Sequence, residues 1–241
     1  MIFVKLCMLL LSAAMACAAV SPPQGPPNKQ DKVNEKRFMD RHVMAACYIY
    51  STFFVFRVSM ECVAIISTCF PDAKTMETIL SITCPNYSRG PDHERIPLLL
   101  PPSFIIGVAG IVLGSAIRIL CFRTLDRFFT FQITIRQNHR LIDSGPYGVV
   151  RHPSYVGGAF AILGTTILSV GPRSYPWACG LATSSALVTF TLWLWIIFLV
   201  YWTYSLLRRA PIEDEELRTT FGKEWEEYAK KVPYLFIPGI I

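Results

Sequence analysis

Two polar segments lie beside apolar blocks and hold the residues best suited to chemistry. The first runs from residue 139 to 158, and its Gly-Pro pair is a turn signal. Pro153 stands where a new helix can begin. Backbone amides at such a start can bind an anion, and Arg151, His152 and Tyr155 can project into a pocket there. An anchor in the headgroup layer is the alternative, since Arg, His and Tyr favour that layer.

The second segment covers residues 207–238. Pro211, followed by the acidic run Glu213–Glu216, predicts a helix start. An apolar stripe at helical spacing follows, formed by Leu217, Phe221, Trp225 and Tyr228. Such a stripe is typical of packing or of an interfacial helix. The acidic run, with Arg208 and Arg209 before it, also fits a solvated, cytosol-flanking helix end.

Long apolar blocks must position these two segments. The chain has 241 residues, of which 52% are hydrophobic and 17% are charged. A transmembrane helix needs about 20 mostly apolar residues. Five blocks are candidates, namely Met1–Val20, Val43–Thr68, Leu98–Leu120, Tyr155–Val170 and Trp177–Leu207. We therefore predict an all-α, polytopic bundle of about five spans, with a cytosolic C-terminal helical segment that completes a pocket.

Charge bias predicts the orientation of these spans. Basic residues gather in the linker at residues 21–41, in the loop at residues 121–153 and at the start of the tail. The positive-inside rule puts these three regions in the cytosol and the N-terminus outside. The first block also resembles a signal peptide, with Ala16-Cys17-Ala18 as a cleavage-like stretch. Its removal would invert every later span, so we expect it to be retained.

Other features of the chain carry weaker predictions. Arg57 and Glu61 are spaced i,i+4 within a span, which predicts an ion pair facing the bundle interior. Four cysteines lie in apolar blocks as small buried hydrophobes, namely Cys47, Cys62, Cys121 and Cys179. Cys69 and Cys84 could pair if their loop faces an oxidising lumen. The sequon at Asn86 falls in the same predicted lumenal loop.

Charge and cysteine spacing exclude some classes of partner. The net charge is +6, with no basic stripe interleaved with stacking aromatics, so we expect membrane lipid and no nucleic acid as a partner. The eight cysteines form no CxxC pair and no Cys/His metal spacing, so we expect no metal.

Taken together, the two polar segments resemble one family. GPYGVVRHPSYVGG in the first and EDEELRTTFGKEWEEYAKKVP in the second are similar to the isoprenylcysteine carboxyl methyltransferases of the endoplasmic reticulum. The resemblance covers about residues 98–238. Hydropathy and this resemblance together divide the chain into a hydrophobic or signal-like segment (1–20), a polar linker (21–41), a second span with a lumenal loop (42–97) and a methyltransferase catalytic region (98–241).

The resemblance implies a multi-pass enzyme of the endoplasmic reticulum membrane whose active site faces the cytosol. Its cofactor would be S-adenosyl-L-methionine, and its substrates would be prenylated, CaaX-processed proteins methylated at the C-terminal carboxylate. Arg209 is implied to hold the substrate and Glu213 to close the cofactor pocket, and these two would carry the reaction. The implied cofactor-binding residues are His139, Arg140, Leu141, Tyr147, Gly148, Val149, Val150, His152, Tyr155 and Glu213.

The chain departs from the family pattern near these residues. Asp214 stands where a second Glu is common, and Pro211 and Ile212 separate Arg209 from Glu213. The register therefore leaves Arg208 open as an alternative to Arg209.

The implied chemistry agrees with the residues present. A carboxylate acceptor is already ionised at neutral pH and needs no general base. It needs alignment and removal of water, and a guanidinium can hold one of its oxygens. A phospholipid N-methyltransferase is the nearest alternative, and its amine acceptor would require a base, for which His152 is the near candidate. A sterol reductase, whose ending the tail also resembles, and a non-catalytic membrane scaffold are further alternatives.

Overall fold

The computed structural model describes residues 2–23, 32–34, 38–70, 74–87 and 98–240. Five of its helices are long and apolar enough to cross a membrane, within Ile2–Val20, Asp40–Ser67, Pro102–Phe128, Pro153–Ala178 and Ala186–Phe221. This confirms the predicted all-α, multi-pass membrane protein. Of the predicted linker, residues 21–23, 32–34 and 38–41 are described, and the others lie outside the described residues.

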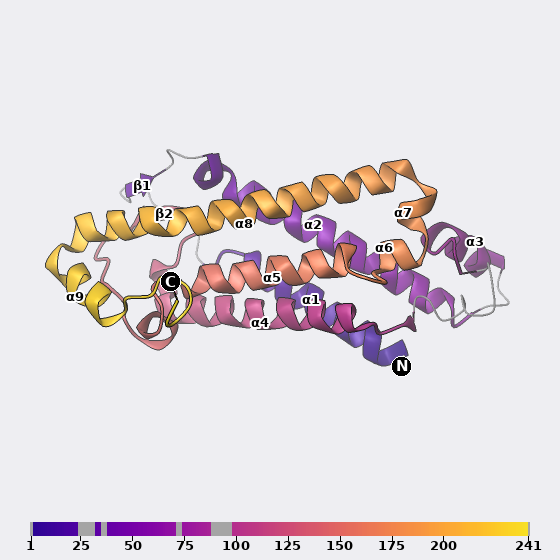
Figure 1. Ribbon diagram of the computed structural model, residues 1–241, viewed down its shortest axis with the longest axis horizontal. Helices are drawn as coiled ribbons and strands as arrows, with labels where there is room; N and C mark the ends of the chain where they lie inside the picture. The colour runs from indigo at the N-terminus through magenta and orange to yellow at the C-terminus, as the bar shows by residue number, and fades with distance from the viewer. Residues whose placement is uncertain (1, 24–31, 35–37, 71–73, 88–97, 241) are drawn as a thin grey trace. The chain divides into compact units, whose positions relative to one another are not determined.

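The elements follow one another in a simple order (Figure 1). They are α1 (Ile2–Val20), β1 (Lys32–Asn34), α2 (Phe38–Ser67), α3 (Lys74–Thr83), α4 (Pro102–Leu125), η2 (Asp126–Phe128), β2 (Ile133–Ile135), η3 (Gly145–Gly148), α5 (Pro153–Val170), α6 (Tyr175–Ala178), α7 (Leu181–Ser184), α8 (Ala186–Phe221) and α9 (Lys223–Lys231). The two short strands pair antiparallel, with Val33 opposite Thr134.

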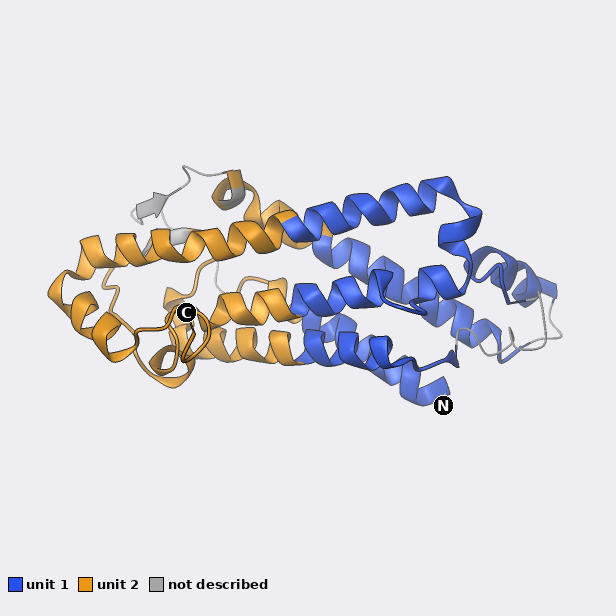
Figure 2. Cartoon of the chain, viewed as in Figure 1, with its two compact units in different colours: residues 1–16, 50–112, 161–200 blue, residues 17–49, 113–160, 201–241 orange. Residues whose placement is uncertain are grey.

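The chain divides into two compact units, coloured separately in Figure 2. Unit 1 comprises residues 1–16, 50–112 and 161–200, and unit 2 comprises residues 17–49, 113–160 and 201–241. Each of the five long helices contributes residues to both units. Both polar segments singled out in the sequence belong to unit 2.

A buried group of three charges lies in unit 1. Glu61 is 2.8 Å from both Lys5 and Arg57, and Arg57 also donates to the carbonyl of Leu168 at 3.1 Å. This confirms the predicted pair on one face of α2 and adds a cation from α1. A buried carboxylate is costly unless it is paired. The contact with Lys5 therefore supplies Glu61 with a second cation, from α1.

A disulfide in unit 1 joins Cys84, just after α3, to Cys179, between α6 and α7. The predicted Cys69–Cys84 bond is wrong, because Cys69 is a free thiol. The interpretation of Cys179 as a small buried hydrophobe is also wrong, because Cys179 forms the disulfide. The two bonded cysteines are 95 residues apart, so only the tertiary fold brings them together. Around the bond pack Ala64, Leu80 and Tyr175.

Asn86 lies against the same segment of unit 1. Its backbone N–H donates to the carbonyl of Cys179 at 3.1 Å, and its Nδ2 donates to that of Ala178 at 3.2 Å. Gly180 has φ +78°, and a Cβ there would lie 2.5 Å from Oδ1 of Asn86. Asn86 therefore stabilises the turn beside the disulfide. The third residue of its sequon lies outside the described residues.

The C-terminal helices differ from the prediction at both ends. Trp177 belongs to α6, so the last span begins later than predicted, at Ala186. Pro211 does not begin a helix but lies inside α8, which continues to Phe221. A proline removes one backbone hydrogen bond, and the helical residues on both sides of it maintain the helix. The predicted amphipathic helix is instead broken at Gly222, whose φ is +54°.

Close helix packing positions the start of α5 in unit 2. A Cβ on Gly157 would lie 2.6 Å from the carbonyl oxygen of Gly114, so α4 and α5 approach closely there. Arg118 of α4 donates to the carbonyl of Ala19 at 2.8 Å and to that of Ser154 at 3.3 Å. A cluster of buried residues completes this core, namely Val43, Cys121, Phe122, Phe129, Phe131 and Tyr147.

Candidate active site

The C-terminal tail after α9 lies against the turn that precedes α5. The backbone N–H of Arg151 donates to the carbonyl of Tyr234, and that of His152 donates to Leu235, both at 2.9 Å. The Arg151 guanidinium also donates to the carbonyls of Val232 at 3.0 Å and Pro233 at 2.9 Å. The two polar segments identified in the sequence therefore form one site in unit 2.

Two adjacent acids of α8 anchor the side chains of this turn. Asp214 accepts from Nε of Arg151 at 3.0 Å and contacts Nε2 of His152 at 2.9 Å. Glu213 accepts the Tyr155 hydroxyl and lies 3.7 Å from Nδ1 of His152. The rings of His152 and Tyr155 stack with centroids 5.3 Å apart. Charge-assisted hydrogen bonds of this kind hold donors and acceptors in a defined geometry.

A pocket opens beside these acids and lies wholly within unit 2. Its empty volume is about 900 Å³, part of it open to solvent. Its walls combine aromatic rings, the acids and the residues of the turn. The lining includes Phe128, Phe129, His139, Arg140, Leu141, Tyr147, Arg151, His152, Tyr155, Glu213, Asp214, Leu217 and Tyr228. Pockets that combine apolar and aromatic walls with a few convergent polar groups bind small molecules and cofactors.

The structure gathers most of the predicted cofactor-binding residues around the pocket. Seven line it, namely His139, Arg140, Leu141, Tyr147, His152, Tyr155 and Glu213. The other three, Gly148, Val149 and Val150, are not among the described residues that line the pocket. Val149 is exposed and Val150 is buried beneath the turn. At Gly148 a Cβ would lie 2.9 Å from the carbonyl oxygen of Asp143, so this glycine permits the tight turn that places Tyr147.

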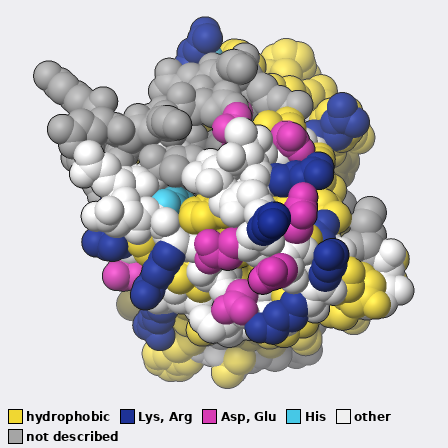
Figure 3. All heavy atoms as spheres, turned by 90° about the vertical axis from the view of Figure 1, so that its left-hand side faces the viewer, with side chains coloured by type: hydrophobic (Ala, Val, Ile, Leu, Met, Phe, Trp, Pro, Cys, Tyr) yellow, Lys and Arg dark blue, Asp and Glu magenta, His cyan; other side chains and the backbone are white. Residues whose placement is uncertain are grey.

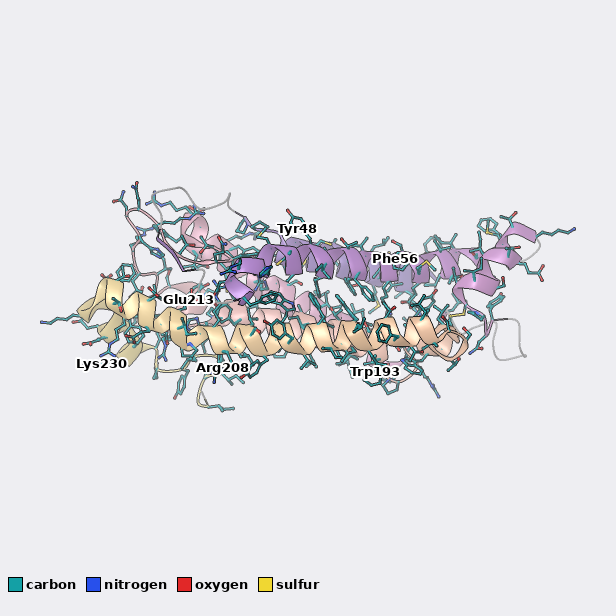
Figure 4. All side chains as sticks on the ribbon, turned by 90° about the horizontal axis from the view of Figure 1, so that it is seen from above. Tyr48, Phe56, Trp193, Arg208, Glu213 and Lys230 are labelled. Carbon is teal, nitrogen blue, oxygen red and sulfur yellow. A yellow bond between two sulfur atoms is a disulfide. The ribbon has the colours of Figure 1, made fainter. Side chains whose placement is uncertain are left out.

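Arg209 is buried beside this pocket and does not belong to its described lining. It is 4% exposed, its Nη1 lies 3.4 Å from Oδ1 of Asp40, and Nη1 also donates to the carbonyl of Phe131. Arg208 is exposed, and Figure 4 shows Arg208 and Glu213 on opposite sides of α8. The structure thus favours Arg209 over Arg208 as the inward-facing arginine of the tail.

Burial shifts the pKa values of three rings that line the pocket, those of His139, Tyr147 and Tyr228, towards the neutral form. Burial lowers the pKa of His139, whose ring stacks on Phe128 at 4.6 Å. Burial raises the pKa of Tyr147 well above its ordinary value, and it also raises the pKa of Tyr228. The Tyr228 hydroxyl donates to the carbonyl of Tyr147 at 2.9 Å, which ties α9 to the turn.

Sequence reasoning missed several residues of this site. Asp214 was noticed as a departure from the family pattern, yet it is the acid that holds Arg151 and His152. Leu217 and Tyr228 were predicted to be packing residues, yet both line the pocket. Asp40 carried no signal, because nothing in the local sequence of α2 indicates that its partner is 169 positions away in the tail.

The end of unit 2 formed by α9 is strongly charged. Figure 3 shows Lys, Arg, Asp and Glu side chains gathered on this face. The exposed charged residues of α9 are Lys223, Glu224, Glu226, Glu227, Lys230 and Lys231. An α8 of 36 residues is about 54 Å long, well beyond the hydrocarbon core of a bilayer of about 30 Å. The charged half of α8 and α9 therefore lie in an aqueous phase.

Known proteins resemble the chain in this region. The sequence model of the Isoprenylcysteine carboxyl methyltransferase (ICMT) family matches residues 105–218. A "Probable protein-S-isoprenylcysteine O-methyltransferase" of Oryza sativa subsp. indica is 36% identical over 129 residues, covering 53% of this chain and 57% of that protein. The "Protein-S-isoprenylcysteine O-methyltransferase" of Homo sapiens is 30% identical over 142 residues, covering 56% of this chain and 42% of that protein.

A second class of protein is also similar to part of the chain. The "Delta(14)-sterol reductase TM7SF2" of Mus musculus is 30% identical over 101 residues, covering 42% of this chain and 20% of that protein. No solved structure matches the chain. The chain spans about half the length of the curated relatives it matches.

The matched segment contains α5, most of α4, and α8 as far as Arg218, and so includes both acids, the stacked His152–Tyr155 pair and Arg209. Residues 105–218 of this chain are similar to the isoprenylcysteine carboxyl methyltransferase family.

Proposed function

We propose that the chain is an S-adenosylmethionine-dependent methyltransferase that acts on the C-terminal prenylcysteine carboxylate of CaaX-processed proteins. One observation carries the proposal. The pocket lies within unit 2, beside the buried Arg209, and two acids of the family-matched segment form one of its walls. A cation-accepting pocket next to a buried guanidinium suits a positively charged methyl donor and a carboxylate acceptor.

The residues of the pocket fit the proposed cofactor. S-adenosylmethionine supplies an electrophilic methyl group on a positively charged sulfur when it is bound. Glu213 and Asp214 provide negative charge that favours a cation, and the neutral rings of Tyr147 and Phe128 offer apolar surface for a nucleoside. Nδ1 of His139 is buried without a hydrogen-bond partner in the described structure, so it is available to a ligand's polar group.

Arg209 is suited to position the acceptor. It is buried, and its Nε has no hydrogen-bond partner in the described part of the protein. A guanidinium can hold one carboxylate oxygen and leave the other free to react. Burial of the site removes water from that carboxylate, which raises its reactivity. No residue needs to remove a proton, since the acceptor is already ionised.

We further propose that the chain resides in the endoplasmic reticulum membrane and that its pocket lies on the cytosolic side. The disulfide Cys84–Cys179 joins the α2–α4 connection to the α5–α8 connection. Disulfides persist in oxidising compartments, which favours a lumenal position for both connections. Each span reverses the side, so the α4–α5 connection and the tail after α8 belong to the opposite, cytosolic side. The positive-inside rule supports the same orientation independently.

The position of His152 disfavours the phospholipid N-methyltransferase alternative. An amine acceptor requires a base, and His152 was the candidate. Both ring nitrogens of His152 face carboxylates of the chain itself, Asp214 at 2.9 Å and Glu213 at 3.7 Å. A histidine held in this way orients the acids and has no ring nitrogen directed at a separate acceptor.

The test uses membranes that contain the full chain, labelled S-adenosylmethionine and one of two acceptors, a farnesylcysteine analogue or phosphatidylethanolamine. We expect label in the farnesylcysteine analogue. Label found only in the lipid would overturn the proposal. Glu213→Gln is expected to raise the KM for S-adenosylmethionine, whereas the exposed neighbour Glu215→Gln serves as a matched control and is expected to change nothing.

A further inference from the structure

Asp40 is a buried carboxylate in the first turn of α2. It is 1% exposed, and its Oδ1 lies 3.4 Å from Nη1 of Arg209. It lies outside residues 105–218, the segment that the family model matches. The acid that pairs with the inward-facing arginine thus comes from a part of the chain to which the family match assigns no role.

The segment after α4 contacts both members of this pair. Nη1 of Arg209 donates to the carbonyl of Phe131, and Nε2 of Gln132 donates to the carbonyl of Asp40 at 3.5 Å. Two segments far apart in sequence, the start of α2 and the segment after α4, therefore converge on the Arg209 guanidinium of α8. These contacts fix it through Nη1, and its buried Nε has no hydrogen-bond partner in the part of the chain that the structure describes.

Electrostatics connect this pair to the pocket. Glu213, which lines the pocket, acts electrostatically on Arg209, and so does Asp40. An isolated buried cation would hold an acceptor carboxylate too strongly, and tight ground-state binding does not accelerate a reaction. Asp40 offsets the charge of Arg209, so the guanidinium can direct the acceptor without trapping it.

We propose that Asp40 is a positioning residue of the acceptor site, which acts through Arg209 and leaves Nε of that arginine for the prenylcysteine carboxylate. This inference rests on the proposed function. If the Asp40–Arg209 ion pair only stabilised the fold, its removal would have a different effect. Its loss would lower the amount or stability of folded protein and affect both substrates alike, whereas loss of positioning affects the acceptor alone.

The experiment compares Asp40→Asn with the wild-type full chain in membranes, measuring the KM for a farnesylcysteine analogue and for S-adenosylmethionine separately. We expect the KM for the acceptor to rise about tenfold or more, because a misplaced guanidinium no longer aligns the carboxylate, while the KM for S-adenosylmethionine stays within twofold. Glu61→Gln is the matched control. It removes another buried, ion-paired carboxylate, in unit 1, and should leave both KM values unchanged.

Two further variants keep the inference testable if Asp40→Asn does not fold. Asp40→Glu retains the charge and displaces the carboxylate by one methylene, so it should raise the acceptor KM by a smaller factor. In an Arg209→Gln background, the change Asp40→Asn should have no additional effect on the acceptor KM.

The outcomes separate the two claims. A wild-type protein that does not label the farnesylcysteine analogue overturns the proposed function. An active wild type with an unchanged acceptor KM in the Asp40 variants, or with both KM values raised equally, overturns the role of Asp40. An additive effect of Asp40→Asn on top of Arg209→Gln also overturns it, because the residue would not be acting through the arginine.

Discussion

Nε2 of His152 and Oδ1 of Asp214 lie 2.9 Å apart, although 62 residues separate them in the chain. The same carboxylate accepts from Arg151 through its other oxygen. One acid of α8 therefore holds the turn that precedes α5, and the adjacent acid is left to face the pocket with Tyr155. The pocket's geometry therefore depends on both acids, because Asp214 holds the turn and Glu213 faces the pocket.

Removal of Asp214 should destabilise the protein. In Asp214→Ala the largely buried Arg151 and His152 lose their carboxylate, and breaking such a pair costs about 3 kcal/mol. We expect a lower Tm in detergent, together with loss of S-adenosylmethionine binding. The exposed Glu215→Ala is the control, and a Tm equal to that of the wild type in the Asp214 variant would contradict this role.

The Tyr155 hydroxyl should contribute to cofactor affinity by holding Glu213. A hydrogen bond to a charged group contributes about 1.5–3 kcal/mol, which corresponds to a tenfold change in affinity or more. Tyr155→Phe is therefore expected to weaken S-adenosylmethionine binding about tenfold by calorimetry or filter binding, with little loss of folded protein. If Glu213→Gln alone and combined with Tyr155→Phe bind S-adenosylmethionine equally well, Tyr155 acts through Glu213. Additive losses of affinity in the double variant would contradict this.

The disulfide should be present in protein taken from the membrane. Closing a loop between residues 95 positions apart restricts the unfolded chain, and native disulfides contribute about 2–4 kcal/mol. We expect Cys84→Ser to lower the Tm and to expose Cys179 to a maleimide reagent. Labelling of both cysteines in the unreduced wild-type protein would show that the bond does not form.

Acid should weaken the pocket through His139. Burial lowers the pKa of His139 from the ordinary 6.5, so the folded protein prefers the neutral ring. Below the unfolded pKa the unfolded chain binds the proton more readily, and stability is lost as pH falls from about 6.5 through the folded pKa. His139→Gln should flatten this part of the Tm–pH profile. An identical acid slope in the variant would assign the effect to another group.

Local sequence patterns determined much of this protein. The five apolar blocks predict the five spans because a span must satisfy its backbone hydrogen bonds internally and match the bilayer thickness. The pair at Arg57 and Glu61 follows from helical spacing alone. The Arg-His-Pro-Ser-Tyr turn and the acid pair identify the two halves of the site, since the chemistry of a site is carried by a few residue types at short spacing.

Tertiary structure decided which distant groups meet. Cys84 pairs with Cys179 and not with Cys69, Asp40 reaches Arg209, and Asp214 takes Arg151 and His152 while Glu213 faces the pocket. Each of these contacts joins residues at least 62 positions apart. Local propensity and periodicity act within one helix or turn, whereas such contacts arise when helices pack and buried charges must find partners from other segments.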